Sequence, residues 1–150
     1  MPSHKLLLDA MLGKLGTYLR MCGYDAAYAL DRGIEADERL RKIAREEDRL
    51  LLTRDRALAA KTERSHLLES REVTAQLREL DEAGFDLTLA ESPTHCGRCN
   101  GPLVALDSDT ETPADVPDPA IEGVWQCRSC GQQFWKGSHW DDVAATLREL

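Results

Sequence analysis

Apolar and polar positions alternate along residues 1–90 with two periods, one typical of strands and the other of helices. Short apolar runs predict strands at residues 5–9, 26–30, 49–53 and 65–70. Apolar residues three or four positions apart predict helices at residues 10–21, from about residue 37, at 56–60 and at 73–83. In the first helix, the face expected to be buried carries Met11, Leu12, Leu15 and Leu19. Strands separated by helices of this length pair in parallel, so this part of the chain predicts a layered α/β fold.

The pattern changes after Pro93. Residues 107–120, DSDTETPADVPDPA, contain five acids and three prolines, and such a segment buries too little apolar surface to fold alone. We expect it to form an extended loop. Val143, Leu147 and Leu150 stand at helical spacing and predict a final helix at residues 139–150. The chain therefore divides into an α/β domain at residues 1–90 and a smaller domain at residues 91–150.

The charge and hydropathy of the chain limit the kinds of partner that it could bind. The chain has 27 acidic and 19 basic residues, and its formal net charge is −8. This balance argues against a broad surface for nucleic acid, because Lys and Arg supply most non-specific affinity for phosphate, but it allows a local basic path. No segment resembles a signal peptide or reaches the run of about 18 apolar residues that a membrane span needs. The sequence therefore predicts a cytoplasmic protein with no membrane partner.

Four of the five cysteines form two C-x-x-C pairs, CGRC at Cys96 and Cys99 and CRSC at Cys127 and Cys130. Disulfides are disfavoured in the cytoplasm, and the duplication disfavours a redox C-x-x-C. Four thiolates close a tetrahedral shell around zinc, and the small residues after each pair let the turns approach sulfur. We therefore predict a structural zinc site, with the adjacent His95 at the surface. Cys22 stands alone and is expected to be a small buried hydrophobe.

Two predicted strands deliver an aspartate at their carboxyl ends, Asp9 in KLLLD and Asp55 in LLTRD. In a parallel sheet these ends share the edge where ligands usually bind. A third acid could come from DRGIEADERL, at Asp37 or at the alternatives Asp31 and Glu35. Clustered carboxylates suit Mg²⁺ or Mn²⁺, which polarise a phosphodiester and activate water. The alternative is that Asp37 and Asp55 cap the helices that follow them.

The segment FWKGSHW, residues 134–140, follows the second cysteine pair. Its aromatic side chains beside Lys136 and His139 could stack on unpaired bases. The alternative is that they cover a zinc domain too small to have much core. For Trp140 both interpretations stay open, whereas Phe134 is expected to be core.

The ordered set LLLDAMLGKLGTYLRMCGYD, LLTRD and FWKGSHW around two C-x-x-C pairs resembles the Mut-seven C-terminal RNase family, PIN-like nucleases with an appended zinc ribbon. The resemblance covers nearly the whole chain. It implies a PIN-like three-layer α/β domain at residues 1–90 and a zinc ribbon at residues 91–150. It also implies metal-dependent hydrolysis of RNA, with Asp9, Asp37 and Asp55 as the catalytic acids and the four paired cysteines as zinc ligands. PIN nucleases often add a fourth acid, for which Glu69 in SHLLES is no clear match.

The leading hypothesis is a ribonuclease in which Asp9, Asp37 and Asp55 hold Mg²⁺ or Mn²⁺. Lys14 and Arg20 on the first helix, and Arg54 beside Asp55, are candidates for phosphate contact or are solvated helix charges. The rival hypothesis is a non-catalytic module that binds RNA or protein through the zinc ribbon, with Lys136, His139 and Trp140 at its surface. A protein partner in RNA processing is a further expectation.

Overall fold

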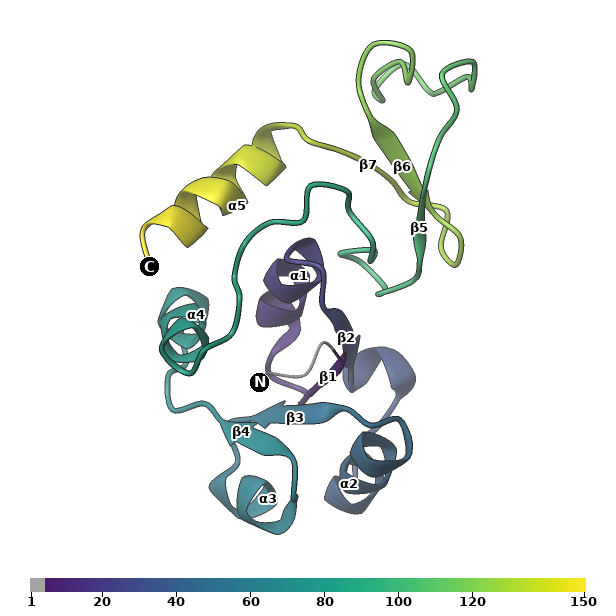
Figure 1. Ribbon diagram of the computed structural model, residues 1–150. Coiled ribbons are helices and arrows are strands. Elements are labelled where there is room, and N and C mark those ends of the chain that lie inside the picture. Colours follow the sequence, from purple (N-terminus) through teal and green to yellow (C-terminus); the bar gives the residue numbers. More distant parts are fainter. Residues whose placement is uncertain (1–4) are drawn as a thin grey trace.

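The computed structural model describes residues 5–150 and contains a four-stranded sheet in the order β2-β1-β3-β4 (Figure 1). Its strands are β1 (Lys5–Leu8), β2 (Asp25–Tyr28), β3 (Leu50–Thr53) and β4 (Ser65–Leu67), and each neighbouring pair is parallel. The helices among them are α1 (Gly13–Met21), α2 (Asp37–Glu46), α3 (Arg56–Lys61) and α4 (Val73–Glu82). The predicted α/β fold with a parallel sheet is thus confirmed. Within residues 5–150, no helix is long and apolar enough to cross a membrane.

Both faces of this sheet are buried. On one face, Leu6 and Leu8 of β1 join a core that includes residues of α1 and α4. On the other face, Leu7 joins a second core that includes residues of α2 and α3. A strand covered on both sides needs a continuous apolar run rather than an alternating one, and this explains the three consecutive leucines. Helices therefore cover the sheet on both sides, whereas the finer PIN-like layering stays a prediction.

Of the element boundaries that differ from those predicted, two change the place of a large apolar residue. Helix α1 begins at Gly13 rather than at residue 10, because a turn precedes it in which the Leu12 amide donates to the Asp9 carbonyl at 3.0 Å. Met11 lies in this turn and is 58% exposed, so its predicted place on the buried face is wrong. Strand β2 ends at Tyr28, and Leu30, 53% exposed, begins the 3₁₀ helix η1 (Leu30–Arg32).

The later part of the chain forms an antiparallel three-stranded sheet of β5 (Leu103–Ala105), β6 (Val124–Cys127) and β7 (Gln133–Trp135). The predicted extended loop at residues 107–120 contains neither helix nor strand. Helix α5 (Ser138–Arg148) then returns to the first sheet (Figure 1), where Leu147 and Leu150 pack against its core. The division into domains at residues 90 and 91 stays a prediction.

A buried arginine joins the amino ends of the central strands. Arg49 donates to the Leu6 carbonyl at 3.1 Å, to the Asp25 carboxylate at 2.8 Å and to Glu47 at 2.8 Å. Burial raises the pKa of Asp25, but hydrogen bonds from Arg49 and Asn100 outweigh it, so the pKa is lowered. Asp25 therefore stabilises the fold above its unfolded pKa of about 3.9, and this contribution is lost as the pH falls through the lower folded pKa.

Replacing Arg49 with alanine is expected to reduce the free energy of unfolding by about 3 kcal/mol, the lower end of the cost of breaking a buried ion pair. Arg64→Ala is the control, because the ion pair of Arg64 with Asp48 is exposed and should contribute less than about 1 kcal/mol. Urea unfolding at neutral pH compares the two variants, and below the folded pKa of Asp25 the effect of Arg49→Ala should shrink. Equal losses in both variants would contradict the structural role of Arg49.

Candidate functional site

At the carboxyl edge of the first sheet, a threonine links the side chain of one aspartate to the main chain of another. Asp9 follows β1 and Asp55 lies two residues after the end of the neighbouring strand β3. The side chain of Thr53, 0% exposed, donates from Oγ1 to Asp9 Oδ2 at 2.7 Å and accepts from the Asp55 amide at 3.0 Å. The Ala10 amide donates to Asp9 Oδ1 at 2.7 Å. The position of the Asp9 carboxylate is thus fixed through both of its oxygens.

Asp55 has a second role as the N-cap of α3, because its Oδ1 accepts from the Leu58 amide at 3.1 Å. Helix capping was the alternative role that the sequence offered for Asp55. Because the cap uses Oδ1, it leaves Oδ2 available to a ligand. Asp37 does not cap α2: Ala36 is the N-cap, and Asp37 is the exposed first residue of that helix. Among residues 5–150, four cysteines are the only group of three or more potential metal ligands whose atoms all lie within 4.8 Å. The metal site of Asp9, Asp37 and Asp55 stays a prediction.

Asp31, one of the alternative third acids, also lies near this edge. Burial raises the pKa of Tyr28, and the charges of Asp31 and Asp9 raise it further, so both acids lie close to that ring. The Tyr28 hydroxyl donates to the Ala10 carbonyl. Asp31 in turn is 3.6 Å from the Arg20 guanidinium, which offsets its charge.

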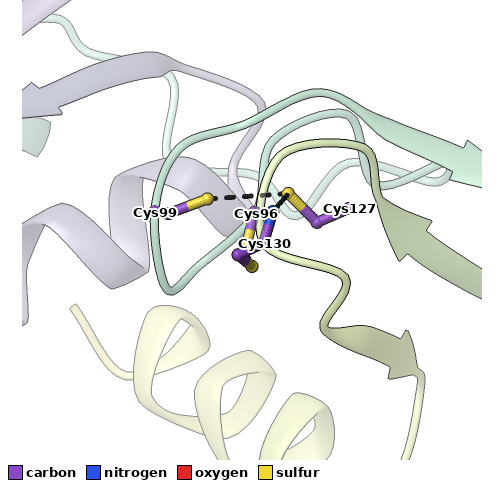
Figure 2. Close-up of side chains that lie close together, drawn as sticks. All are labelled: Cys96, Cys99, Cys127 and Cys130. Atoms are coloured by element: carbon purple, nitrogen blue, oxygen red, sulfur yellow. Dashed lines mark hydrogen bonds between the residues drawn. The ribbon is translucent and has the colours of Figure 1, made fainter.

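The four paired cysteines come together from two turns, as Figure 2 shows. The Sγ atoms of Cys96 and Cys130 are 3.7 Å apart, and those of Cys99 and Cys127 are 3.5 Å apart. Tetrahedral zinc with bonds of about 2.3 Å separates its sulfur ligands by about 3.8 Å, so the cluster fits a zinc ion. A Cβ at position 101 would lie 2.7 Å from Cys127 Sγ, which explains why a glycine follows the first turn.

The thiols of the metal-free cluster differ in acidity. Burial raises the pKa of Cys96 to about 12. Burial also acts to raise the pKa of Cys127, but the amides of Cys130 and Ser129 donate to its sulfur and lower the pKa to about 7. Because thiols must lose their protons to bind a metal ion, zinc binding would displace a proton from Cys96.

The first cysteine turn docks on the α/β sheet through polar contacts that sequence reasoning missed. The carbonyl of Gly97 accepts from Arg20 Nη1 at 3.0 Å and from Thr17 Oγ1 at 3.3 Å. Asn100, with a positive φ of 68°, accepts from the Ala26 amide at 2.9 Å and donates to Asp25 at 2.7 Å. Arg20, only 4% exposed, also donates to the Ala26 carbonyl at 2.9 Å. It is therefore neither a solvated charge nor a phosphate contact.

The other predicted substrate contacts fall into two places. Lys14 on α1 is exposed, and Arg54 at the carboxyl edge is half-buried with Nη1 3.7 Å from Met11 Sδ. Within the described part of the chain, neither of these cations forms an ion pair. Lys136, exposed His139 and half-buried Trp140 lie instead where β7 leads into α5.

Lys136 is held by three contacts. Its Nζ donates to the Glu91 carbonyl at 2.6 Å, and it lies 6.0 Å from the Trp125 ring centroid and 5.2 Å from that of Trp140. These contacts fix the Trp140 ring and tie residue 91 to the start of α5. The geometry of Lys136 therefore favours a structural role.

Two further side chains were assigned from sequence. His95 is half-buried rather than fully at the surface, and its Nδ1 lies 3.0 Å from Thr94 Oγ1. Cys22 is half-buried against the first core, and burial raises the pKa of its thiol to about 12. Its predicted role as a small hydrophobe fits this environment, because a neutral thiol is a poor nucleophile at pH 7.

The fold and its two sites define a class of protein: a parallel α/β sheet with aspartates at its carboxyl edge, joined to a four-cysteine cluster that could bind zinc. The chain belongs to the Mut7-C RNAse domain family, whose model matches residues 4–147. The resemblance seen in the sequence motifs is thereby confirmed, and the family indicates a nuclease-like function. Comparisons with curated proteins and with solved structures found no match.

Proposed function

We propose that the protein is a metal-dependent ribonuclease that hydrolyses RNA phosphodiester bonds at the carboxyl edge of its first sheet. The observation that carries this proposal is the bridge from Asp9 through Thr53 to Asp55. It orients the Asp9 carboxylate beside the main chain of Asp55, whose own carboxylate is held by the Leu58 amide, in a family named for its RNAse domain. Their oxygen atoms suit Mg²⁺ or Mn²⁺, and Asp37 would complete the set. A metal ion bound there would polarise the phosphodiester and activate water.

The unpaired cations near this edge support a path for the substrate. Lys14 on α1 and Arg54 beside Asp55 are free to contact phosphate, because neither forms an ion pair within residues 5–150. The chain as a whole is acidic, with a net charge of −8, so RNA would enter along this restricted path. Cytoplasmic location and a protein partner in RNA processing belong to the same proposal.

Hydrolysis of an end-labelled single-stranded RNA by the zinc-loaded full chain tests the activity. Turnover is expected with added Mn²⁺ or Mg²⁺ and not without them. Binding of RNA without turnover under either condition would favour the alternative, a non-catalytic RNA-binding module. Gel analysis of the labelled products would also show whether cleavage is internal or proceeds from an end.

Replacing Thr53 with valine is expected to reduce the hydrolysis rate about 10–100-fold, the usual cost of losing a group that orients a metal ligand. Valine keeps the shape of threonine but cannot donate to Asp9 or accept from the Asp55 amide. Thr53→Ser retains the hydroxyl and should retain most of the activity. The assay compares both variants with the wild type over a range of Mn²⁺ concentrations. If valine and serine variants have equal rates at every concentration, the bridge does not orient the aspartates.

A further inference from the structure

A cavity of about 420 Å³ lies away from the carboxyl edge, between α1, the first cysteine turn and the start of α5. Its volume is within the range of about 300–1,000 Å³ that is usual for small-ligand pockets. The side chains that matter for its chemistry are Thr17, His95, Arg98, Phe134, His139 and Trp140. They come from three segments far apart in the sequence, so the cavity exists only when the cysteine turns are docked on the α/β sheet.

The charge of the cavity is opposite to that of the whole chain. Acids outnumber bases by 27 to 19 in the sequence. Among the residues that line the cavity, however, there is no aspartate or glutamate, whereas the positively charged Arg98 is present. Arg98 is exposed, and its guanidinium donates to the neutral side chain of Gln132 at 3.2 Å. Its positive charge is therefore available to an anionic ligand.

The other wall of the cavity is aromatic. Phe134, Trp135 and Trp140 line it, and each is half-buried, so that part of each ring stays accessible. The contact of Lys136 Nζ with the Trp140 ring, at 5.2 Å from its centroid, holds that ring in place. Proteins that bind single strands stack the bases on aromatic rings and bind the phosphates with cations beside them. A fixed aromatic ring beside a cation provides both contacts.

We propose that this cavity binds one unpaired nucleobase of an RNA strand, stacked on Trp140, with Arg98 at an adjacent phosphate. This inference rests on the proposed function and makes unpaired RNA the substrate class. In a duplex the bases are stacked and paired, so they cannot enter such a cavity. Helix α1 leads from the carboxyl edge, where it begins just after Asp9, to the cavity, which its residues Thr17 and Met21 line. At about 1.5 Å per residue, the helix spans about 12 Å, so one strand can reach both sites.

Binding of a short fluorescein-labelled uridine homopolymer, followed by fluorescence anisotropy, tests the inference. The zinc-loaded full chain is used without added Mg²⁺ or Mn²⁺, so that no turnover occurs. The wild type is expected to bind this strand at least about tenfold more tightly than a blunt RNA duplex of the same length. Trp140→Leu should weaken binding to the single strand about tenfold, the effect usual for a stacked aromatic side chain, and Trp140→Phe should restore most of it.

Arg98 has a matched control within the chain. Arg128 occupies the second C-x-x-C pair, is exposed like Arg98, and does not line the cavity. Arg98→Ala should weaken binding several-fold and reduce its dependence on salt, whereas Arg128→Ala should leave both unchanged. His139 is an exposed residue of the cavity lining, so His139→Ala provides a further variant. The test therefore does not depend on whether Trp140→Leu folds.

Equal affinity for single strand and duplex would overturn the inference, as would equal binding by the Arg98 and Arg128 variants. Binding is measured without a catalytic metal ion, so it separates this inference from the proposed function. A protein that binds the single strand through the cavity but never hydrolyses it would refute the nuclease alone. A protein that hydrolyses RNA with unchanged affinity in all cavity variants would refute the base-binding cavity alone.

Discussion

Replacing Asp9 with asparagine is expected to lower the rate of RNA hydrolysis by more than about 100-fold. Groups that merely orient a metal ligand already contribute about 10–100-fold, and Asp9 is proposed to be a ligand itself. Asparagine keeps the size of the side chain and can still accept from Thr53 through its one carbonyl oxygen, so the fold should be retained although the bond from the Ala10 amide is lost. The rate is measured with Mn²⁺ at matched zinc content and matched circular dichroism.

Asp141→Asn provides the control for Asp9→Asn, because it removes the same charge from an exposed position in the first turn of α5. It should hydrolyse RNA at the wild-type rate. The same assay identifies the third acid: Asp37→Asn is expected to lose activity, whereas Asp31→Asn, which removes the partner of Arg20, should retain it. Activity that persists in the Asp9 variant would place the chemistry away from the carboxyl edge.

Replacing Cys96 with serine is expected to abolish stoichiometric zinc binding and to unfold the antiparallel sheet of β5 to β7. Structural zinc contributes about 10–16 kcal/mol in zinc-finger peptides, which exceeds what so small a sheet can supply by burial. Cys22→Ser, at the cysteine outside the cluster, should leave the zinc content at one per chain. Zinc content and urea unfolding of both variants check the expectation.

The effect of zinc loss is expected to reach the first sheet. Amide hydrogen exchange should become faster in α1 and β2, because the cysteine turn would no longer hold Arg20 and Ala26 through Gly97 and Asn100. Zinc affinity should also rise with pH, since a proton must leave Cys96, whose pKa is raised to about 12 by burial. Unchanged exchange in α1 and β2 after zinc removal would show that the cysteine turns do not support the first sheet.

The parts of the structure that follow from sequence are those encoded by local pattern. Three consecutive leucines indicated a strand, and Leu6, Leu7 and Leu8 form one that is fully buried. The two C-x-x-C pairs indicated a cluster because their spacing is itself the signature of the site. The error at Met11 was also local, because the turn that precedes α1 interrupts the helical period there.

The polar contacts between distant segments could not be predicted in this way. Arg20 reaches a carbonyl 77 positions away, and Asn100 reaches an amide 74 positions away. A charged residue on a helix looks the same in sequence whether its partner is water or a buried carbonyl. The residues after the first cysteine pair were recognised only as letting the turn approach sulfur, yet Asn100 among them also forms the dock on β2. FWKGSHW was recognised as a possible stacking surface, but its meeting with Thr17, His95 and Arg98 in one cavity was not predicted, for the same reason.

The dock on β2 has a consequence for how the chain can be divided. β2 is an outer strand of its sheet, and the side chains of Asn100 and Arg20 occupy the amide and carbonyl of Ala26. A fragment cut before the cysteine turns would lose Asn100 and the cover of Leu147 and Leu150 over the core. Its uncovered strand and apolar surface would then invite pairing with a second copy, the usual route from an open sheet edge to aggregation. The second half of the chain would thus protect the first half from self-association.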